Sequence, residues 1–328
     1  MQRRHFIKCS LLSLTVATVR VKGINLTSSN TGKVRFGLIT DVHEDLQKDA
    51  TLRMREFIKK ANEEKVDFVI QLGDLCHSKG VDKILPEFNA FQGKKYHVFG
   101  NHDMDNASKE EMLEKYNMPN GYYFFDRGGV RFIVLDCAYT RKEGTLVDYN
   151  HGNYFVNRMD RDLIHPEEIE WARQVITESD NPCVIFSHQA FDEIGGSVPN
   201  REDFRKMLRE VNKPERKVIA MVCGHHHIDA HSVIDGVDYI QMNSASYQWI
   251  ENDHTYSNGH MAEYKDSLYA FIDIDVKKKQ MHITGRISTF KDPAPKLDDF
   301  SKKYQEENKH TTAWKYLYPV ISDRIIEW

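Results

Sequence analysis

Side chains able to bind a metal or move a proton stand directly after five apolar runs of this sequence. The runs are "FGLIT", "FVIQL", "YHVF", "CVIFS" and "IAMVC", and the residues that follow them include Asp41, His43, Asp74, Asn101, His188, His225 and His227. In open α/β sheets, ligands bind beyond the carboxyl ends of the strands. If the runs are strands of this kind, we expect these side chains to meet at one edge.

A metal site explains this convergence better than chance does. A single histidine after a strand is more often a hydrogen-bonded surface residue than a ligand, and Asp41 or Asn101 alone could be a turn former or a helix cap. Carboxylates and imidazoles gathered in one place would repel or desolvate one another unless cations neutralised them. Mixed oxygen and imidazole ligands without thiolate favour Mn, Fe, Zn, Co or Ni.

The three consecutive histidines in "VCGHHHIDAH" fall into two groups if their backbone is extended. Side chains alternate along an extended segment, so His225 and His227 point one way and His226 the other. The same rule pairs Asp41 with His43. We therefore predict His225 and His227 as ligands and His226 as a neighbour of the site or a solvent-facing residue.

The rest of the sequence supplies the elements that must position these residues. Apolar, strand-like runs alternate with helical patterns, which are expected at residues 51–64, 109–116, 166–178 and 201–211. Strands interleaved with helices indicate an α/β domain whose strands are covered by helices. Pro166 and the acidic residues after it suit the start of a helix, where the helix dipole is positive.

Taken together, D-x-H, G-D, G-N-H-D, a single histidine after a strand and G-H-x-H occur in an order that resembles the calcineurin-like metallophosphoesterases. The resemblance spans residues 34 to about 290. It implies an α/β fold built as a two-sheet β-sandwich flanked by helices, in four αββα layers, with two metal ions at one edge. By motif, it implies that one metal is held by Asp41, His43 and His227, the other by Asn101, His188 and His225, and both by Asp74.

Hydrolysis of a phosphate ester, either a monoester or a diester, is the activity that this resemblance implies. Two divalent ions about 3.5 to 4 Å apart bind the phosphate oxygens and lower the pKa of a shared water toward about 7. The resulting hydroxide attacks phosphorus in line. His102 is expected to act as the general acid that protonates the departing alkoxide. An orienting hydrogen-bond donor is the alternative role for His102.

Two positions differ from branches of this family. The Ser/Thr protein phosphatases carry an acid three residues after the bridging aspartate and an arginine after their G-N-H-E motif, where this sequence has His77 and Asp103-Met104-Asp105. Protein phosphatase activity is therefore not expected. Because the carboxylate of Asp105 would repel a phosphate, Asp105 is expected to face away from it. His77, Asn243 and Tyr247 are candidate substrate-binding residues, with ordinary packing as an equal alternative for Tyr247.

Two other functions fit part of the pattern. Asp41-x-His43-x-Asp45 also matches the D-x-H-x-D motif of binuclear-manganese ureohydrolases, and "FIDIDVKK" offers a second D-x-D. That amidine hydrolase activity would leave His188 and the G-H-x-H pair without a role. A non-catalytic interaction module on the same fold is the other alternative, although such modules typically lose ligands and none is lost here.

Composition and the N-terminus bear on partners and location. The net charge of −4 gives no basic footprint for nucleic acid or an anionic membrane, so a small phosphate ester is the expected partner, and oligomeric state stays open. "MQRRHFIKCSLLSLTVATV" has a basic start followed by an apolar run too short to span a membrane. Arg3 and Arg4 resemble a twin-arginine export signal. We expect a periplasmic or cell-envelope location, with a cytoplasmic one as the alternative.

Three segments are predicted along the chain. Residues 1–32 form the export-signal-like segment and a polar linker, residues 33–290 form the catalytic domain, and residues 291–328 form a tail that packs on the domain or acts as a lid. Cys137, Cys183 and Cys223 lie in apolar runs, which predicts buried cysteines rather than disulfides.

Overall fold

Two six-stranded sheets form the centre of the structure, which is a computed structural model of the chain. The first has the order β19 (Arg324–Glu327), β16 (Gln280–Thr284), β15 (Ala270–Asp275), β1 (Lys33–Ile39), β2 (Phe68–Gln71), β3 (Lys94–His97). The second has the order β11 (Ala230–Ile234), β12 (Val237–Gln241), β10 (Val218–Cys223), β9 (Cys183–Phe186), β5 (Val130–Val134), β4 (Tyr123–Arg127). The predicted two-sheet α/β sandwich is therefore confirmed.

The structure describes residues 32–152, 156–195, 198–213, 215–249, 261–295 and 318–328. The export-signal-like segment predicted for residues 1–32 thus lies outside the described residues, apart from its last position. Most of the predicted tail lies outside them as well. Within the described part, every helix is too short or too polar to cross a bilayer.

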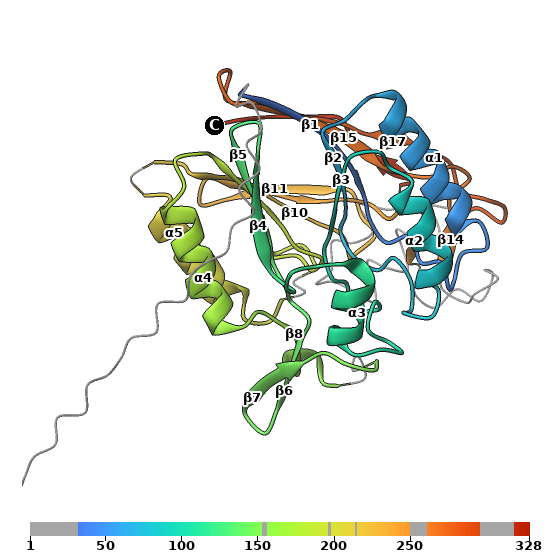
Figure 1. Cartoon of the computed structure of the whole chain (residues 1–328), viewed down its shortest axis with the longest axis horizontal. Coiled ribbons are helices and arrows are strands. Elements are labelled where there is room, and N and C mark those ends of the chain that lie inside the picture. The colour runs from blue at the N-terminus through green and yellow to red at the C-terminus, as the bar shows by residue number, and fades with distance from the viewer. Residues whose placement is uncertain (1–31, 153–155, 196–197, 214, 250–260, 296–317) are drawn as a thin grey trace, which may run out of the picture.

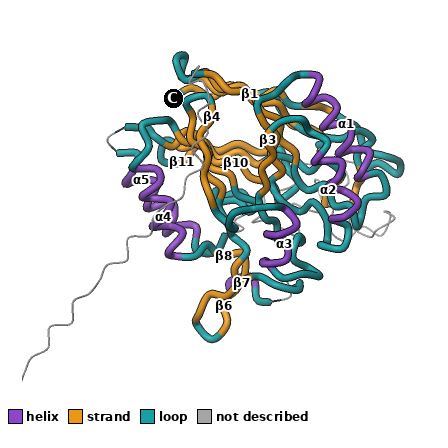
Figure 2. The backbone as a smooth tube through the Cα atoms, viewed as in Figure 1, coloured by secondary structure: helices purple, strands orange, loops and turns teal. Residues whose placement is uncertain are grey.

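Helices cover the outer faces of both sheets. They are α1 (Ala50–Glu63), α2 (Val81–Asn89), α3 (Lys109–Tyr116), α4 (Pro166–Thr177) and α5 (Arg201–Val211). Figure 1 shows α1 and α2 on one side of the sheets and α4 and α5 on the other, and Figure 2 shows the strands between them. Four of these helices match the predicted ranges to within one residue. The sequence does not predict α2, which contains Pro86.

Shorter strands lie outside the two large sheets. They form a three-stranded sheet of β6 (Tyr139–Lys142), β7 (Thr145–Asp148) and β8 (Arg161–Leu163), and the pairs β13 (Tyr247–Trp249) with β14 (Met261–Glu263) and β17 (Arg286–Ile287) with β18 (Val320–Ile321). The last residues of the chain supply β18 and β19, and β19 is an edge strand of the first sheet.

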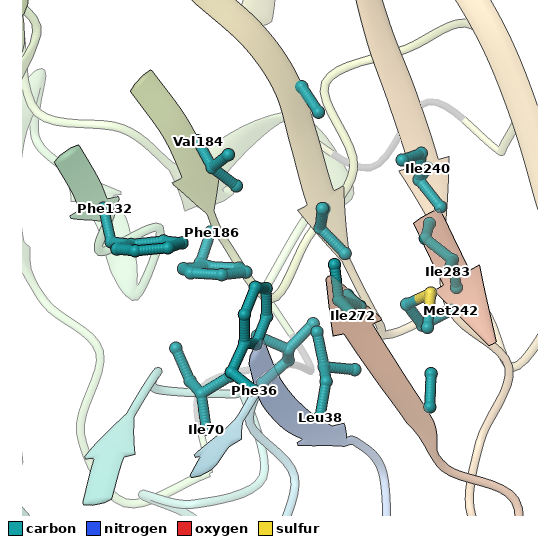
Figure 3. Packing of buried hydrophobic residues seen from close by; sticks show 14 of the residues in the cluster. Phe36, Leu38, Ile70, Phe132, Val184, Phe186, Ile240, Met242, Ile272 and Ile283 are labelled. Carbon is teal, nitrogen blue, oxygen red and sulfur yellow. The ribbon is translucent and has the colours of Figure 1, made fainter. Parts of the chain in front are cut away.

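Alternating side chains of the strands build the layers. In β1, Val34, Phe36 and Leu38 belong to the core between the sheets, whereas Ile39 packs with residues of α1 and α2. Phe36 meets Phe132 and Phe186 of the second sheet edge-on, with ring centroids 5.5 and 5.9 Å away; Figure 3 shows these rings. Edge-to-face pairs of this kind add about 0.5–1.5 kcal/mol each to the effect of burial.

Parallel pairing sends several strands toward one rim of the sandwich. β1, β2 and β3 run parallel in the first sheet, and β5, β9, β10 and β12 run parallel in the second. Hydrogen bonds join the loops that follow them: Asp41 N donates to Gly73 O (3.1 Å), and Gly224 N donates to His188 O (3.0 Å). The residues singled out by the sequence therefore stand on loops held close together.

The cysteines of the described residues are buried, as the sequence predicts for three of them. Cys76, Cys137, Cys183 and Cys223 are all free thiols in the described part of the chain. The burial of Cys137, Cys183 and Cys223 confirms the prediction that these three serve as small apolar core residues.

The contacts of Phe36 predict a large loss of stability when its ring is removed. Phe36 is fully buried, so Phe36→Ala should lower the free energy of unfolding by about 3–5 kcal/mol, measured by chemical denaturation. Leu52→Ala is the matched control, because Leu52 lies on α1 with 59% of its surface exposed, and it should change stability by less than about 0.5 kcal/mol. Equal losses in the two variants would contradict the packing described for the inter-sheet core.

Candidate functional site

Carboxylates and imidazoles from four loops meet at the rim where the two sheets end. His227 Nε2 lies 3.2 Å from Asp41 Oδ1, and His188 Nε2 lies 3.1 Å from Asp74 Oδ2. Cross contacts join these pairs, because His43 Nε2 is 3.7 Å from Asp74 Oδ2 and His188 Nε2 is 3.9 Å from Asp41 Oδ1. The loops after β1, β2, β9 and β10 thus contribute to one cluster.

Within this cluster the side chains form two neighbouring groups of three. Asp41, His43 and His227 make one group, and Asp74, His188 and His225 make the other. In each group, one donor atom per residue lies within 4.8 Å of the others. The two groups are linked by the contacts of Asp74 and Asp41 just described, so two cations could sit side by side here.

Several buried polar atoms at the site lack a hydrogen-bond partner among the described residues, and a bound metal ion would supply one. Asp41 Oδ1, His43 Nε2 and Asn101 Oδ1 are buried and accept or donate no hydrogen bond among the described residues. His225 Nδ1 and His188 Nε2, two imidazole nitrogens, face each other at 3.2 Å. Buried polar groups are nearly always satisfied, and Mn²⁺ or Zn²⁺ would satisfy this mixture of oxygen and imidazole donors.

Backbone carbonyls fix which nitrogen of two imidazoles faces the site. His188 Nδ1 lies 2.7 Å from Leu72 O, and His227 Nδ1 lies 3.0 Å from Tyr247 O. A carbonyl oxygen only accepts, so Nδ1 carries the proton in both rings and Nε2 is turned toward the carboxylates. Metal-binding histidines usually donate their other ring nitrogen in this way.

The backbone at these residues is left-handed rather than extended. The φ angles are 52° at Asp41, His43 and Asp74, 72° at His225 and 54° at His227. The sequence pairs Asp41 with His43, and His225 with His227, by assuming alternation along an extended chain. Asp41 and His43 do lie in one group, whereas His225 and His227 lie in the two neighbouring groups. The assumed extended conformation is wrong, because these loops turn sharply at each of the paired residues.

Glycines of one motif leave room for the carboxylate of another. A Cβ on Gly100, in G-N-H-D, would strike Asp74 Oδ1, and a Cβ on Gly224, in G-H-x-H, would strike Asp41 Oδ2. The Asp41 carboxylate also accepts hydrogen bonds from Thr40 Oγ1 and from His225 N. These close approaches explain why the glycines stand where they do.

Asp103 holds the loops after β2 and β3 together, a role that was not predicted from the sequence. Its carboxylate accepts hydrogen bonds from the backbone N–H groups of Asp74, Leu75 and Gly100 and from the hydroxyl of Tyr116. The fourth residue of the G-N-H-D motif therefore fixes the position of the predicted bridging aspartate. The presence of Asp103 in this motif was the sequence feature from which its role could have been predicted.

Charge pairing offsets the burial of these groups. Burial alone would raise the pKa of Asp74, but His188 and His102 hold it well below its usual range. Burial would lower the pKa of His188, yet Asp74 and Asp41 raise it to about 10, whereas burial lowers the pKa of His43 to about 3. The raised pKa of His188 favours its protonated ring, so a cation that binds here competes with that proton.

The loop after β3 presents His102 beside the cluster. His102 N donates to Asp74 Oδ1 (2.8 Å), and His102 Nδ1 donates to Asp105 Oδ2 (2.8 Å). Burial would lower the pKa of His102, but Asp74 and Asp105 raise it to about 9. The sequence predicts that Asp105 faces away from the site; the structure instead turns its carboxylate onto His102 and within 3.2 Å of His77 Nε2.

Of the residues predicted to contact substrate, two have structural roles. Asn243 is buried, donates to the carbonyls of Tyr318 and Val320 and accepts from the Tyr264 hydroxyl, so it anchors the end of the chain instead of facing substrate. Tyr247 is also buried, and its ring packs against His227 and His43 at 4.6 and 5.3 Å. It supports these imidazoles.

Trp249 and His226 border the site. Trp249 is 41% exposed, and its ring lies 5.7 Å from that of His227 and edge-on to Tyr247 at 5.0 Å. His226 turns away from the cluster and places Nδ1 2.8 Å from Gln241 Oε1. It is a neighbour of the site, which is one of the two roles that the sequence predicts for it.

The second D-x-D of the sequence lies far from this rim. Asp273 and Asp275 of β15 pair with Arg35 and Lys33, at the beginning of β1, whereas the cluster follows the end of that strand. The D-x-H-x-D motif at Asp41 and the D-x-D motif at Asp273 therefore do not share a site, as a ureohydrolase centre would require.

Comparison with known proteins gives a family and several relatives. The model of the calcineurin-like phosphoesterase family matches residues 34–229. A manganese-dependent ADP-ribose/CDP-alcohol diphosphatase of Arabidopsis thaliana is 28% identical over 181 residues, which are 48% of this chain and 52% of the relative. The protein of the same name from Oryza sativa subsp. japonica is 33% identical over 85 residues, which are 22% of this chain and 26% of the relative. The chain thus spans about half or less of the length of these curated relatives.

Solved structures with the same fold include an enzyme and an anchor. A dimetal phosphatase from Danio rerio superposes with a TM-score of 0.60 at 19% identity, covering 77% of this chain and 96% of that one. The anchor in the inner membrane complex of Plasmodium superposes with a TM-score of 0.53 at 13% identity, covering 78% of this chain and 84% of that one. At these identities the likeness concerns the fold alone.

The position of Asp74 predicts that its charge is needed for metal binding. Asp74→Asn removes the carboxylate that lies against both His43 and His188, so the purified, manganese-loaded variant should hold fewer than two ions per chain by elemental analysis. Asp82→Asn is the matched control, because Asp82 is 82% exposed and pairs only with Lys115 among the residues described. If Asp74→Asn retains as much metal as this control, Asp74 does not bridge the two groups.

Proposed function

Because the chain belongs to the calcineurin-like phosphoesterase family, we propose that it hydrolyses phosphate esters with the help of two divalent cations held at the rim of the sandwich. The observation that carries this proposal is the pair of groups Asp41, His43, His227 and Asp74, His188, His225, whose donor atoms converge and among which Asp41 Oδ1 and His43 Nε2 are buried without a hydrogen-bond partner. Buried carboxylates and imidazoles are kept together at a lower cost when a positively charged ligand neutralises them.

Each residue of the site has a proposed part in binding the cations. Asp41, His43 and His227 would hold one, Asn101, His188 and His225 the other, and Asp74 both. When bound, cations of this kind activate water as a nucleophile and neutralise phosphate oxygens. The donor set suits Mn, Fe, Zn, Co or Ni, and the relatives named as manganese-dependent make Mn²⁺ the first to test.

His102 would give a proton to the oxygen that leaves phosphorus. The P–O bond to the leaving group breaks as the proton on the ring of His102 moves to that oxygen. The raised pKa of His102 favours the protonated ring near neutral pH, and Asp105 fixes the ring by its hydrogen bond at Nδ1. Asn101 supplies a neutral oxygen, which limits the negative charge that an anionic substrate meets.

Nucleotide diphosphates are the substrate class that we propose to test first. Two curated relatives are named for ADP-ribose and CDP-alcohols. Trp249 supports the same class, because its exposed ring beside His227 could stack on a nucleobase. The ring of His77, a candidate substrate residue by sequence, stacks on that of His102 and is proposed to act beside the general acid instead of binding the nucleotide.

Export across the inner membrane is a separate proposal about location. It is supported by the twin-arginine-like start of the sequence, Arg3 and Arg4 followed by an apolar run. A cytoplasmic location is the alternative. Fractionation of cells that produce the full chain, beside an Arg3→Lys/Arg4→Lys variant, distinguishes the two.

An assay with defined metals tests the proposed activity. Chain stripped by EDTA and reloaded with Mn²⁺ should hydrolyse p-nitrophenyl phosphate, bis-p-nitrophenyl phosphate or ADP-ribose, and EDTA should abolish the rate. The panel also decides between monoester, diester and diphosphate substrates. Inactivity on every ester with each of the five metals would favour the non-catalytic module.

Removal of the His102 ring tests the acid role. His102→Ala should keep both metals but slow an alkyl ester, such as glycerol 2-phosphate, by about 10²–10⁴ in kcat. The effect on the p-nitrophenyl ester of the same class should be much smaller, because nitrophenolate leaves without a proton. Equal losses on the two esters would show that His102 orients the substrate instead of protonating the leaving group.

A further inference from the structure

We propose that His77 is a positioning residue that holds His102 in place through Asp105 and ties it to the metal-binding loop through Asp45. This inference rests on the proposed function, since it concerns the general acid of that reaction. It assigns a role to a cluster that the predicted metal ligands do not account for: His77, Asp45, Asp105 and His102.

Two carboxylates lie against the two nitrogens of the His77 ring. His77 Nδ1 lies 3.0 Å from Asp45 Oδ2, and His77 Nε2 lies 3.2 Å from Asp105 Oδ2, although this second contact does not have hydrogen-bond geometry. Asp45 Oδ1 also accepts a hydrogen bond from His77 N at 3.0 Å. Asp45 therefore fixes both the main chain and the ring of His77, which limits the positions that the ring can take.

The ring of His77 in turn restrains the ring of His102. The rings of His77 and His102 are stacked, with centroids 4.7 Å apart and an angle of 23° between their planes. Oδ2 of Asp105 approaches both rings, at 2.8 Å from His102 Nδ1 and 3.2 Å from His77 Nε2. The Asp105 side chain is only 6% exposed, so it has little freedom to leave this position. His102 is thus held at one edge by Asp105 and on one face by His77.

At its far end this cluster reaches the predicted metal ligands. Asp45 lies two residues after His43, and donor atoms of His43, Asp45 and His77 come within 4.8 Å of one another. The ring of His43 also meets that of His102 at 5.5 Å. A movement of the loop that carries Asp41 and His43 would therefore displace His102 through the contacts of His77. The same donor atoms could instead bind a third cation, which is the competing explanation.

Substitution of His77 tests this role by comparing two esters. His77→Phe keeps a ring for stacking but loses both nitrogens, and His77 is 26% exposed, so the fold should tolerate the change. We expect two ions per chain, a similar KM, and kcat lowered roughly 10- to 100-fold on glycerol 2-phosphate. The p-nitrophenyl ester should be affected far less. His77→Gln, whose amide can donate to Asp105, should recover part of the loss.

Two controls separate a role through His102 from a general loss of structure. His231→Phe removes the ring nitrogens from a similar pair, His231 Nε2 with Asp238 Oδ1 at 2.5 Å, on β11 and β12, and should leave both rates unchanged. In the double variant His77→Phe/His102→Ala, the loss should equal that of His102→Ala alone, because a positioning residue acts only through the residue that it positions. Additive losses, equal losses on both esters, or a third ion that disappears in His77→Phe would each overturn the proposal.

The effect of His77 on His102 can also be measured without an activity assay. Imidazole ¹⁵N chemical shifts of the full chain report the hydrogen bond at His102 Nδ1, and they should change in His77→Phe but not in His231→Phe. An unchanged His102 signal would overturn the positioning role even in an active enzyme. If the wild-type chain hydrolyses no ester, the proposed function fails, and the ¹⁵N shifts still show whether His77 holds His102.

Discussion

The burial of two carboxylates at a rim shared by two sheets is the constraint on which this structure depends. Asp41 and Asp74 are 0% and 2% exposed, and an unpaired buried ion costs several kcal/mol. The imidazoles of His188 and His227 lie against these carboxylates. Imidazoles and an amide oxygen with no other partner complete the rim, so divalent cations are the ligands that best neutralise it.

Placing these groups together requires an unusual backbone, and the fold supplies the means. Five of the seven predicted ligands adopt left-handed φ angles, a conformation that costs non-glycine residues of the order of 1–3 kcal/mol each. Asp103 binds three backbone N–H groups around Asp74 and Gly100, and the inter-sheet core around Phe36 fixes the strands from which the loops start. Strain of this kind persists only where the surroundings determine the position of the chain, and it is typical of functional sites.

The local patterns predicted the parts, and long-range contacts decided how they meet. The seven predicted ligands could be named from the sequence because each follows a strand, and α3 and α5 have the predicted ranges. The expectation of two sheets came from the family resemblance, and the division of the strands between them was not predicted, since periodicity does not say which strands pair. Asn243 was misassigned because its partners, Tyr318 and Val320, are distant in sequence. Helix α2 was missed because Pro86 interrupts its pattern.

Anomalous diffraction from crystals of the manganese-loaded chain tests the central claim most directly. Two manganese peaks about 3.5 to 4 Å apart should appear, one contacted by Asp41, His43 and His227, the other by Asn101, His188 and His225, with Asp74 touching both. A single peak, or manganese bound elsewhere while Asp41 and Asp74 remain paired only with histidines, would contradict the binuclear centre.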